Sequence, residues 1–273
     1  MSTPVERLQA RLATVGAPLC LGIDPHPDAL PQGFSRDAQG IEAFARGILE
    51  AAAGSAIAVK VNLAFFEAFG SAGWAALERL RRDVPQELPF ITDAKRGDIG
   101  STAERQATSI FEVLEADGVT VSPYLGEDAI EPFLAYEDRI LYVLARTSNR
   151  SAATLQDQSV GERPVYEHVA QWVARRWPER RVGLVVGATA PGELAALRLA
   201  VPGPAFLVPG VGAQGGDLEA AVRNCHGSLA PGLVNVSRGI MQASRGADWQ
   251  AAAGHAAREL AEAMREVGAT LPA

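Results

Sequence analysis

Three charged residues follow an apolar run near the middle of the sequence. The run PFIT leads directly into Asp93, Lys95 and Asp98, with Gly97 and Gly100 beside them. Side chains alternate along a strand, so an extended segment would place Asp93 and Lys95 on the same face. Asp98 follows a turn and can return to that face or reach a neighbour. Charged side chains are rarely buried without a partner, so this acid–base–acid set predicts a charged network.

Chance charges on a solvated loop would give a similar pattern. This cluster, however, ends a strand instead of covering a helix face, which favours a functional site. Other apolar runs of strand length also end in polar or small residues. Asp24 alone could cap a turn, and Lys60 alone could reach solvent. Together the strand-end residues predict one shared rim: Asp24, Lys60, Asp93, Lys95, Ser148, Gly187, Pro209 and Ser237.

Two segments in the last third of the chain predict a phosphate site. The glycine-rich stretch 208–217 offers backbone N–H groups that no side chain obstructs, and it leads into a helix whose positive end favours an anion. Arg238 follows the last predicted strand, and it would bind a phosphate by charge-assisted hydrogen bonds. Barrels that bind phosphate commonly use the loops after strands seven and eight.

The elements that must position these residues alternate regularly between strand and helix. Strands are predicted at 18–24, 57–62, 88–94, 119–122, 139–145, 182–187, 205–209 and 233–237, with helical segments between them. An additional amphipathic helix at 5–15 precedes the first strand. Eight such units without a change in composition predict an α/β fold, a single (β/α)8 TIM barrel in one domain over 1–273.

An open, doubly wound sheet is the second interpretation of the same alternation. That fold more often has fewer strands and a G-x-G-x-x-G fingerprint after the first one, which this sequence lacks. In a barrel the active site lies at the carboxyl ends of the strands. The long polar segment 147–163 follows the fifth strand and is therefore a candidate lid.

Composition limits the classes of partner. The chain has 273 residues, 48% of them hydrophobic, and a net charge of -7, which argues against a general binder of nucleic acid or of anionic membranes. The two cysteines, Cys20 and Cys225, have no metal-ligand spacing and are interpreted as small core residues. Residues 1–16 lack the apolar centre of a signal peptide, and no apolar run reaches membrane length. These features predict a cytoplasmic protein.

Several motifs resemble one family, in matching order. The most specific is DAKRGDIGST at 93–102, and the others are LGID at 21–24, VKVN at 59–62, RTSN at 146–149, PGVGAQGG at 209–216 and SRG at 237–239. Over about residues 19–241 the chain resembles orotidine 5′-phosphate decarboxylase, in particular the longer bacterial branch (type 2). Ser237 is a departure, because many relatives have glycine before the arginine.

The resemblance implies the last step of UMP biosynthesis, a decarboxylation of orotidine 5′-monophosphate to UMP without cofactor or metal. Lys95 would protonate C6, Asp93 would lie beside the departing carboxylate, and Lys60 would belong to the charged network. A homodimer with shared active sites is implied, with Asp98 contributed across the interface. The implied substrate contacts are Thr102 across the interface and Asp24 to the ribose, Ser148 to the pyrimidine, Gln214 and Arg238 to the phosphate, and Pro209 in the same substrate-binding set.

Two other functions fit parts of the pattern. A related barrel decarboxylase that acts on a sugar phosphate shares Asp-x-Lys-x-x-Asp, and its enediolate chemistry would need a divalent metal. The sequence around Arg96 to Gly100 and the loop of Gln214 argue against it. A protein that only binds a nucleotide phosphate would leave the charged set of Lys60, Asp93, Lys95 and Asp98 without a purpose.

Overall fold

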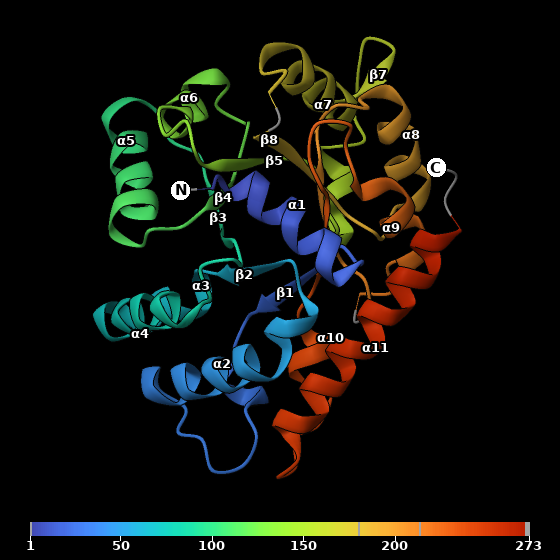
Figure 1. Ribbon diagram of the computed structural model, residues 1–273. Coiled ribbons are helices and arrows are strands. Elements are labelled where there is room, and N and C mark those ends of the chain that lie inside the picture. The colour runs from blue at the N-terminus through green and yellow to red at the C-terminus, as the bar shows by residue number, and fades with distance from the viewer. Residues whose placement is uncertain (1, 180, 213, 271–273) are drawn as a thin grey trace.

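Eight parallel strands form a closed barrel in the computed structural model, which describes residues 2–179, 181–212 and 214–270 (Figure 1). The strands are β1 (Leu19–Ile23), β2 (Ala58–Asn62), β3 (Phe90–Arg96), β4 (Gly118–Val121), β5 (Ile140–Arg146), β8 (Val182–Val186), β9 (Phe206–Pro209) and β10 (Leu233–Val236). Their order around the barrel follows the sequence, and β1 pairs with both β2 and β10 to close it. The TIM barrel predicted from the alternation is confirmed.

Helices surround the barrel in Figure 1 and cover its outer face. They are α2 (Ala38–Ala52), α3 (Ala64–Glu67), α4 (Gly70–Asp83), α5 (Gly100–Thr108), α6 (Glu131–Leu134), α7 (Val165–Arg176), α8 (Pro191–Ala200), α9 (Leu218–Cys225), α10 (Arg238–Met241) and α11 (Trp249–Ala269). Apolar residues on these helices and on the outer faces of the strands form the main core. Along the part of the chain that the structure describes, none of the helices is long and apolar enough to cross a bilayer.

The predicted N-terminal helix is present as α1 (Pro4–Val15), and it lies across the start of the barrel strands (Figure 1). A capping box between Thr3 and Glu6 begins the helix. Val5 and Leu8 on its buried face join a second apolar cluster, whose other members lie on the strands and inside the barrel. Arg7 forms an ion pair with the buried Asp117, just before β4. The helix thus closes the end of the barrel opposite the strand carboxyl ends.

Three local features were not predicted from the sequence. A turn of π-helix (Ser109–Val113) continues α5, and the four-residue helix α10 follows β10 directly. The segment 147–163, predicted as a loop, contains a 3₁₀ helix (Arg150–Thr154) and the first strand of a short hairpin, β6 (Ser159–Val160) with β7 (Arg163–Pro164). Gly161 permits this tight turn because its φ of 64° is accessible to glycine at little cost.

Both cysteines are buried with free thiols, as their interpretation as core residues requires. Burial raises the pKa of the Cys20 and Cys225 thiols to about 12, so neither is a thiolate at neutral pH.

Candidate active site

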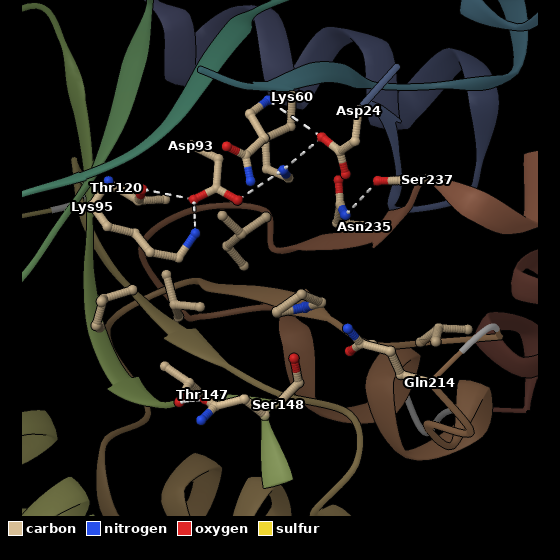
Figure 2. A pocket seen from close by; sticks show the side chains of 18 of the residues that line it. Asp24, Lys60, Asp93, Lys95, Thr120, Thr147, Ser148, Gln214, Asn235 and Ser237 are labelled. Carbon is tan, nitrogen blue, oxygen red and sulfur yellow. Dashed lines mark hydrogen bonds and ion pairs between the residues drawn. The ribbon is translucent and has the colours of Figure 1, made fainter. Parts of the chain in front are cut away.

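A cavity of about 490 Å³ opens at the carboxyl ends of the strands. Eight of the ten residues predicted for the site line it: Asp24, Lys60, Asp93, Lys95, Ser148, Pro209, Gln214 and Arg238. The side chains of Asp24, Lys60, Asp93 and Lys95 gather on one side of the cavity (Figure 2). Thr147, Ser148 and Gln214 lie across from them. Gly187 and Ser237, also predicted for the rim, directly follow β8 and β10, and Ser237 is part of the lining.

The charged network is centred on the Asp93 carboxylate. Its Oδ2 lies 3.0 Å from Lys60 Nζ, and its Oδ1 lies 2.5 Å from Lys95 Nζ. Lys60 Nζ is also 3.8 Å from Asp24 Oδ1. Parallel pairing positions these groups, because Lys60 is in register with Gly22 on β1, and Asn62 with Asp93 on β3. Three adjacent strands therefore deliver four charges to one wall.

The two lysines occupy different environments. The side chain of Lys60 is only 4% exposed, whereas that of Lys95 is 48% exposed and its ammonium faces the cavity (Figure 2). Burial disfavours the charge on Lys60, but the carboxylates of Asp24 and Asp93 outweigh it and hold the pKa of Lys60 above its ordinary value. Burial likewise favours a neutral Asp93, yet Lys60 and Lys95 hold the pKa of its carboxyl well below the usual range. Lys60 and Asp93 are thus both charged at neutral pH.

The chain contains only two lysines, and both are in this cavity; the other 23 of its 25 basic residues are arginines. This count is visible in the sequence, and it could have singled out Lys60 and Lys95 without any motif.

Asp98 and Thr102 are not part of the cavity in one chain. The Asp98 carboxylate accepts a hydrogen bond from Ile99 N at 2.8 Å, and Thr102 is exposed in the first turn of α5. The predicted four-residue network therefore has three of its members together, Lys60, Asp93 and Lys95. Within one chain, Asp98 does not return to the face of Asp93 and Lys95.

The phosphate segment folds as a tight glycine loop. Gly210, Gly212 and Gly215 have φ values of 102°, 77° and 76°, and Gly216 N donates to Gly210 O at 3.0 Å. Ala213, which belongs to the same motif, lies outside the described residues. The Arg238 guanidinium lines the cavity and has no ion-pair partner in the described part of the chain, which leaves it available to an anion.

The helix after the glycine loop already carries a cap at its N-terminus. The helix after the glycine loop, α9, was expected to present its positive end to the anion. Instead the Asp217 side chain caps that end and accepts a hydrogen bond from Ala220 N at 2.9 Å. A carboxylate already satisfies this N-terminus, and a second anion there would be repelled.

The Ser237 side chain can be accommodated because it faces Gly22, which has no side chain. A Cβ atom at Gly22 would lie 1.9 Å from Ser237 Oγ, so no other residue at position 22 would leave room for this hydroxyl. Asn235 Nδ2 lies 3.4 Å from the same hydroxyl, and Asn235 is buried at the cavity wall. Its Oδ1 has no hydrogen-bond partner among the described residues.

Several lining residues were not singled out individually by the sequence analysis. Thr147, Asn149 and Gln156 lie within the predicted lid, and Gly210 and Val211 lie within the stretch 208–217. Those outside both segments are Asn62, Thr120, Leu144, Val185, Leu207 and Asn235. Leu144, Val185 and Leu207 give the cavity an apolar side, which an apolar strand sequence does not distinguish from core. Gln156 is the tenth residue of the predicted lid. Its side chain accepts a hydrogen bond from Thr147 N and donates one to Thr147 Oγ1, each at 2.8 Å, so the segment is tied back to the rim.

Within residues 2–179, 181–212 and 214–270, no group of three or more histidine, cysteine, aspartate or glutamate side chains is placed to hold a metal ion.

Comparisons with known proteins agree with one another. The model of the "Orotidine 5'-phosphate decarboxylase / HUMPS family" matches residues 17–253. A protein of Roseiflexus castenholzii named orotidine 5'-phosphate decarboxylase is 52% identical over 249 residues, 90% of this chain and 91% of that protein.

Solved structures are similar along nearly the whole chain. OMP decarboxylase of Leishmania donovani is 39% identical with a TM-score of 0.83, covering 97% of this chain and 99% of that one. UMP synthase of Leishmania donovani is 40% identical with a TM-score of 0.84, and the match covers 97% of this chain but 56% of the longer synthase.

Proposed function

The chain belongs to the orotidine 5′-phosphate decarboxylase / HUMPS family, and from that membership we propose that it converts orotidine 5′-monophosphate to UMP and CO₂ in UMP biosynthesis. Relatives that carry this name match the chain at 52% identity and over nine tenths of its length. The observation that supports the chemistry most directly is the network of Lys60, Asp93 and Lys95 on one wall of the cavity.

Lys95 is the proton donor in this proposal. Loss of CO₂ from C6 of the pyrimidine leaves a carbanion in the ring plane, where no π-system is placed to delocalise it. An ammonium fixed beside that carbon stabilises the developing charge and then supplies the proton. Lys95 suits both tasks, since its ammonium is exposed to the cavity while a carboxylate 2.5 Å away fixes its direction.

Asp93 and Lys60 prepare the site for that step. The ionised Asp93 would lie beside the substrate carboxylate and would keep the Lys95 ammonium charged. Lys60 is buried and paired with two carboxylates, so it balances their charge and does not itself reach the reacting carbon. The net effect is a fixed field that favours departure of CO₂ and protonation of C6.

The remaining lining residues would bind the other parts of the nucleotide. Arg238 and Gln214 would bind the phosphate, Ser148 would face the pyrimidine, and Asp24 would bind the ribose; Pro209 belongs to the same set. Arg238 supports this orientation, because it lines the same cavity as the glycine loop and its guanidinium has no ion-pair partner among the described residues. Binding energy at the remote phosphate can then be used to hold the ring against Lys95.

A homodimer would complete the site with Asp98 and Thr102 of a second copy. Both lie outside the cavity of their own chain; Ile99, next to Asp98, is exposed, and so are Tyr124 and Leu125, which follow β4. Tyr124 is 79% exposed, an unusual state for a large aromatic side chain on a free surface. The proposal treats the whole chain as one domain, and a cytoplasmic location stays a prediction from the sequence.

The metal-dependent sugar-phosphate reaction is not favoured, because the similar proteins named above carry the orotidine or UMP names. The experiment follows the ultraviolet absorbance of orotidine 5′-monophosphate with purified protein in EDTA. We expect the substrate band to disappear as UMP forms. A folded protein that leaves the substrate unchanged, but acts on a sugar phosphate once magnesium is added, would overturn the proposal.

A further inference from the structure

We propose that Thr120 is a positioning residue for the decarboxylation: its hydroxyl fixes both the backbone of Lys95 and the carboxylate of Asp93. The inference rests on the proposed function for its kinetic part only. The geometry that carries it lies in the pairing of β3 with β4.

The backbone of β3 leaves regular strand geometry at the proposed catalytic residues. Thr92 pairs with Val119, and Arg96 pairs with Val121. Asp93, Ala94 and Lys95 therefore stand opposite the single residue Thr120. Insertions of this kind redirect side chains and leave backbone groups without their partners in the ladder.

Lys95 itself has a φ of 48°, in the left-handed region. Among the described residues only Glu115 shares a positive φ without being glycine. A side chain with a Cβ atom adopts this conformation at a cost, so surrounding contacts must hold it in place. Those contacts converge on one hydroxyl.

Thr120 Oγ1 makes three hydrogen bonds of equal length. It accepts from Ala94 N and from Lys95 N, each at 3.0 Å, and it donates to Asp93 Oδ1 at 3.0 Å. A hydroxyl has one donor and two acceptor positions, so its capacity is fully used. The residue is 1% exposed, which leaves little room for water to replace these bonds.

The accepting oxygen of Asp93 is the one that binds the Lys95 ammonium. Oδ1 receives both the Thr120 hydroxyl and Lys95 Nζ, while Oδ2 receives Lys60 Nζ. Thr120 therefore fixes Lys95 in two ways. It accepts a hydrogen bond from the Lys95 backbone N–H, and it donates to the carboxylate that orients the Lys95 ammonium (Figure 2). Removing this hydroxyl should misplace the ammonium without removing any group that contacts the nucleotide's phosphate.

The kinetic test compares Thr120→Val, Thr120→Ser and a matched control, Thr92→Val. Thr92 is a buried threonine on β3 whose hydroxyl donates to Gly118 O at 3.0 Å and, among the described residues, makes no hydrogen bond to Asp93 or Lys95. For Thr120→Val we expect kcat to fall at least about tenfold, with KM and the Kd of UMP within about threefold of wild type. Thr120→Ser and Thr92→Val should keep kcat within about threefold.

A second measurement does not depend on activity. Since the chain has two lysines, protein labelled with ¹⁵N-lysine gives two lysine backbone amide signals, which the Lys95→Ala variant assigns. In Thr120→Val the Lys95 amide should shift and exchange with solvent at least about tenfold faster, because its acceptor is gone. The Lys60 amide should be unaffected, and Thr120→Ser should resemble wild type.

The outcomes separate this inference from the proposed function. An inactive wild-type protein would refute the function, and the amide signals would still test the geometry. An active wild type with a Thr120→Val variant of equal kcat would overturn the positioning role, as would equal losses in Thr120→Ser. If Thr120→Val does not fold, Thr120→Ala replaces it, and equal kcat for the Ala and Ser variants would overturn the proposal.

Discussion

One carboxylate, that of Asp93, pairs with both lysines of the cavity. The two lysines differ in their burial, and this difference suits them to different tasks. Lys60 is buried and lies within 4 Å of two carboxylates, so its charge is permanent and its ammonium is enclosed. Lys95 shares Asp93 but extends into the open cavity. In the proposed function, the same side-chain type would therefore provide a fixed charge in one position and a transferable proton in the other.

Replacing Lys95 by alanine should abolish turnover and leave the nucleotide site intact. We expect kcat to fall by at least about 1,000-fold, because the variant lacks both the stabilising charge and the proton. Binding of UMP should remain measurable by calorimetry, since the residues proposed to bind its phosphate are unchanged. Arg258→Ala, which removes a cation from α11, is the control and should have wild-type kcat. Normal turnover by Lys95→Ala would contradict the assignment of Lys95.

His226 makes stability depend on pH near neutrality. Its Nδ1 accepts a hydrogen bond from Gly232 N at 3.2 Å, which requires the neutral ring. Burial, with a smaller contribution from Arg198, lowers the pKa of His226 below 6.5. The unfolded chain then binds a proton that the folded chain does not, so stability should be lost as the pH falls below about 6.5.

The measurement is Tm between pH 7.5 and 5.5 for wild type and His226→Asn, whose amide oxygen can accept the same bond. Over this range the Tm of the variant should fall by less than the Tm of wild type. An identical loss in both proteins would show that His226 is not responsible.

At the scale of elements, the barrel could be predicted well from the sequence because each strand is a short apolar run that ends at a polar or small residue. All eight strands are where the alternation places them, within two residues at either end. What escaped prediction has no periodicity of its own: the four residues of α10, the hairpin in 147–163 and the irregular pairing opposite Thr120. Threonine is an ordinary strand residue, so its role appears only when β4 lies next to β3.

The same limit applies to the site. Asp24, Lys60, Asp93 and Lys95 were predicted from the ends of strands, and they do converge. Asp98 lies past the end of β3, where the turn and not the strand decides its direction, so spacing alone left two possibilities open. The N-terminus of α9 illustrates the same limit. Glycines before a helix indicate an anion site, but the residue at the N-cap, here Asp217, determines whether the helix N-terminus is free to bind an anion.

The contact between α1 and the barrel should contribute to stability and not to catalysis. Leu8 is 1% exposed and packs in the apolar cluster inside the barrel, on the end opposite the cavity. Leu8→Ala should destabilise the protein by about 2–4 kcal/mol in denaturant unfolding, with kcat unchanged where the protein is folded. Leu199→Ala is the matched control, because Leu199 is 85% exposed on α8 and should change stability by less than about 0.5 kcal/mol. A large loss of kcat in folded Leu8→Ala would mean that α1 influences the site.

At the scale of the whole molecule, each active site of the proposed dimer would contain residues from both chains. Lys95→Ala and Asp98→Ala should each be nearly inactive alone. A mixed dimer would contain one site with both residues and one with neither. After equal amounts are unfolded together and refolded, about half of the dimers are mixed, so about a quarter of wild-type activity should return.

Analytical ultracentrifugation of the mixture establishes that dimers have formed. Recovery well below that level, in a preparation that is fully dimeric, would indicate that Asp98 acts within its own chain or not at all.

The near absence of lysine from the rest of the chain has a consequence for its reactivity. Arginine carries almost all of the positive charge, and guanidinium groups do not react with ordinary acyl donors. Of the two lysine amines, one is enclosed and one faces an open cavity. Acetylation, carbamylation or coupling to an activated resin would therefore find few reactive amines other than that of Lys95. In most enzymes such reagents modify many surface lysines, whereas here they would modify the proposed proton donor.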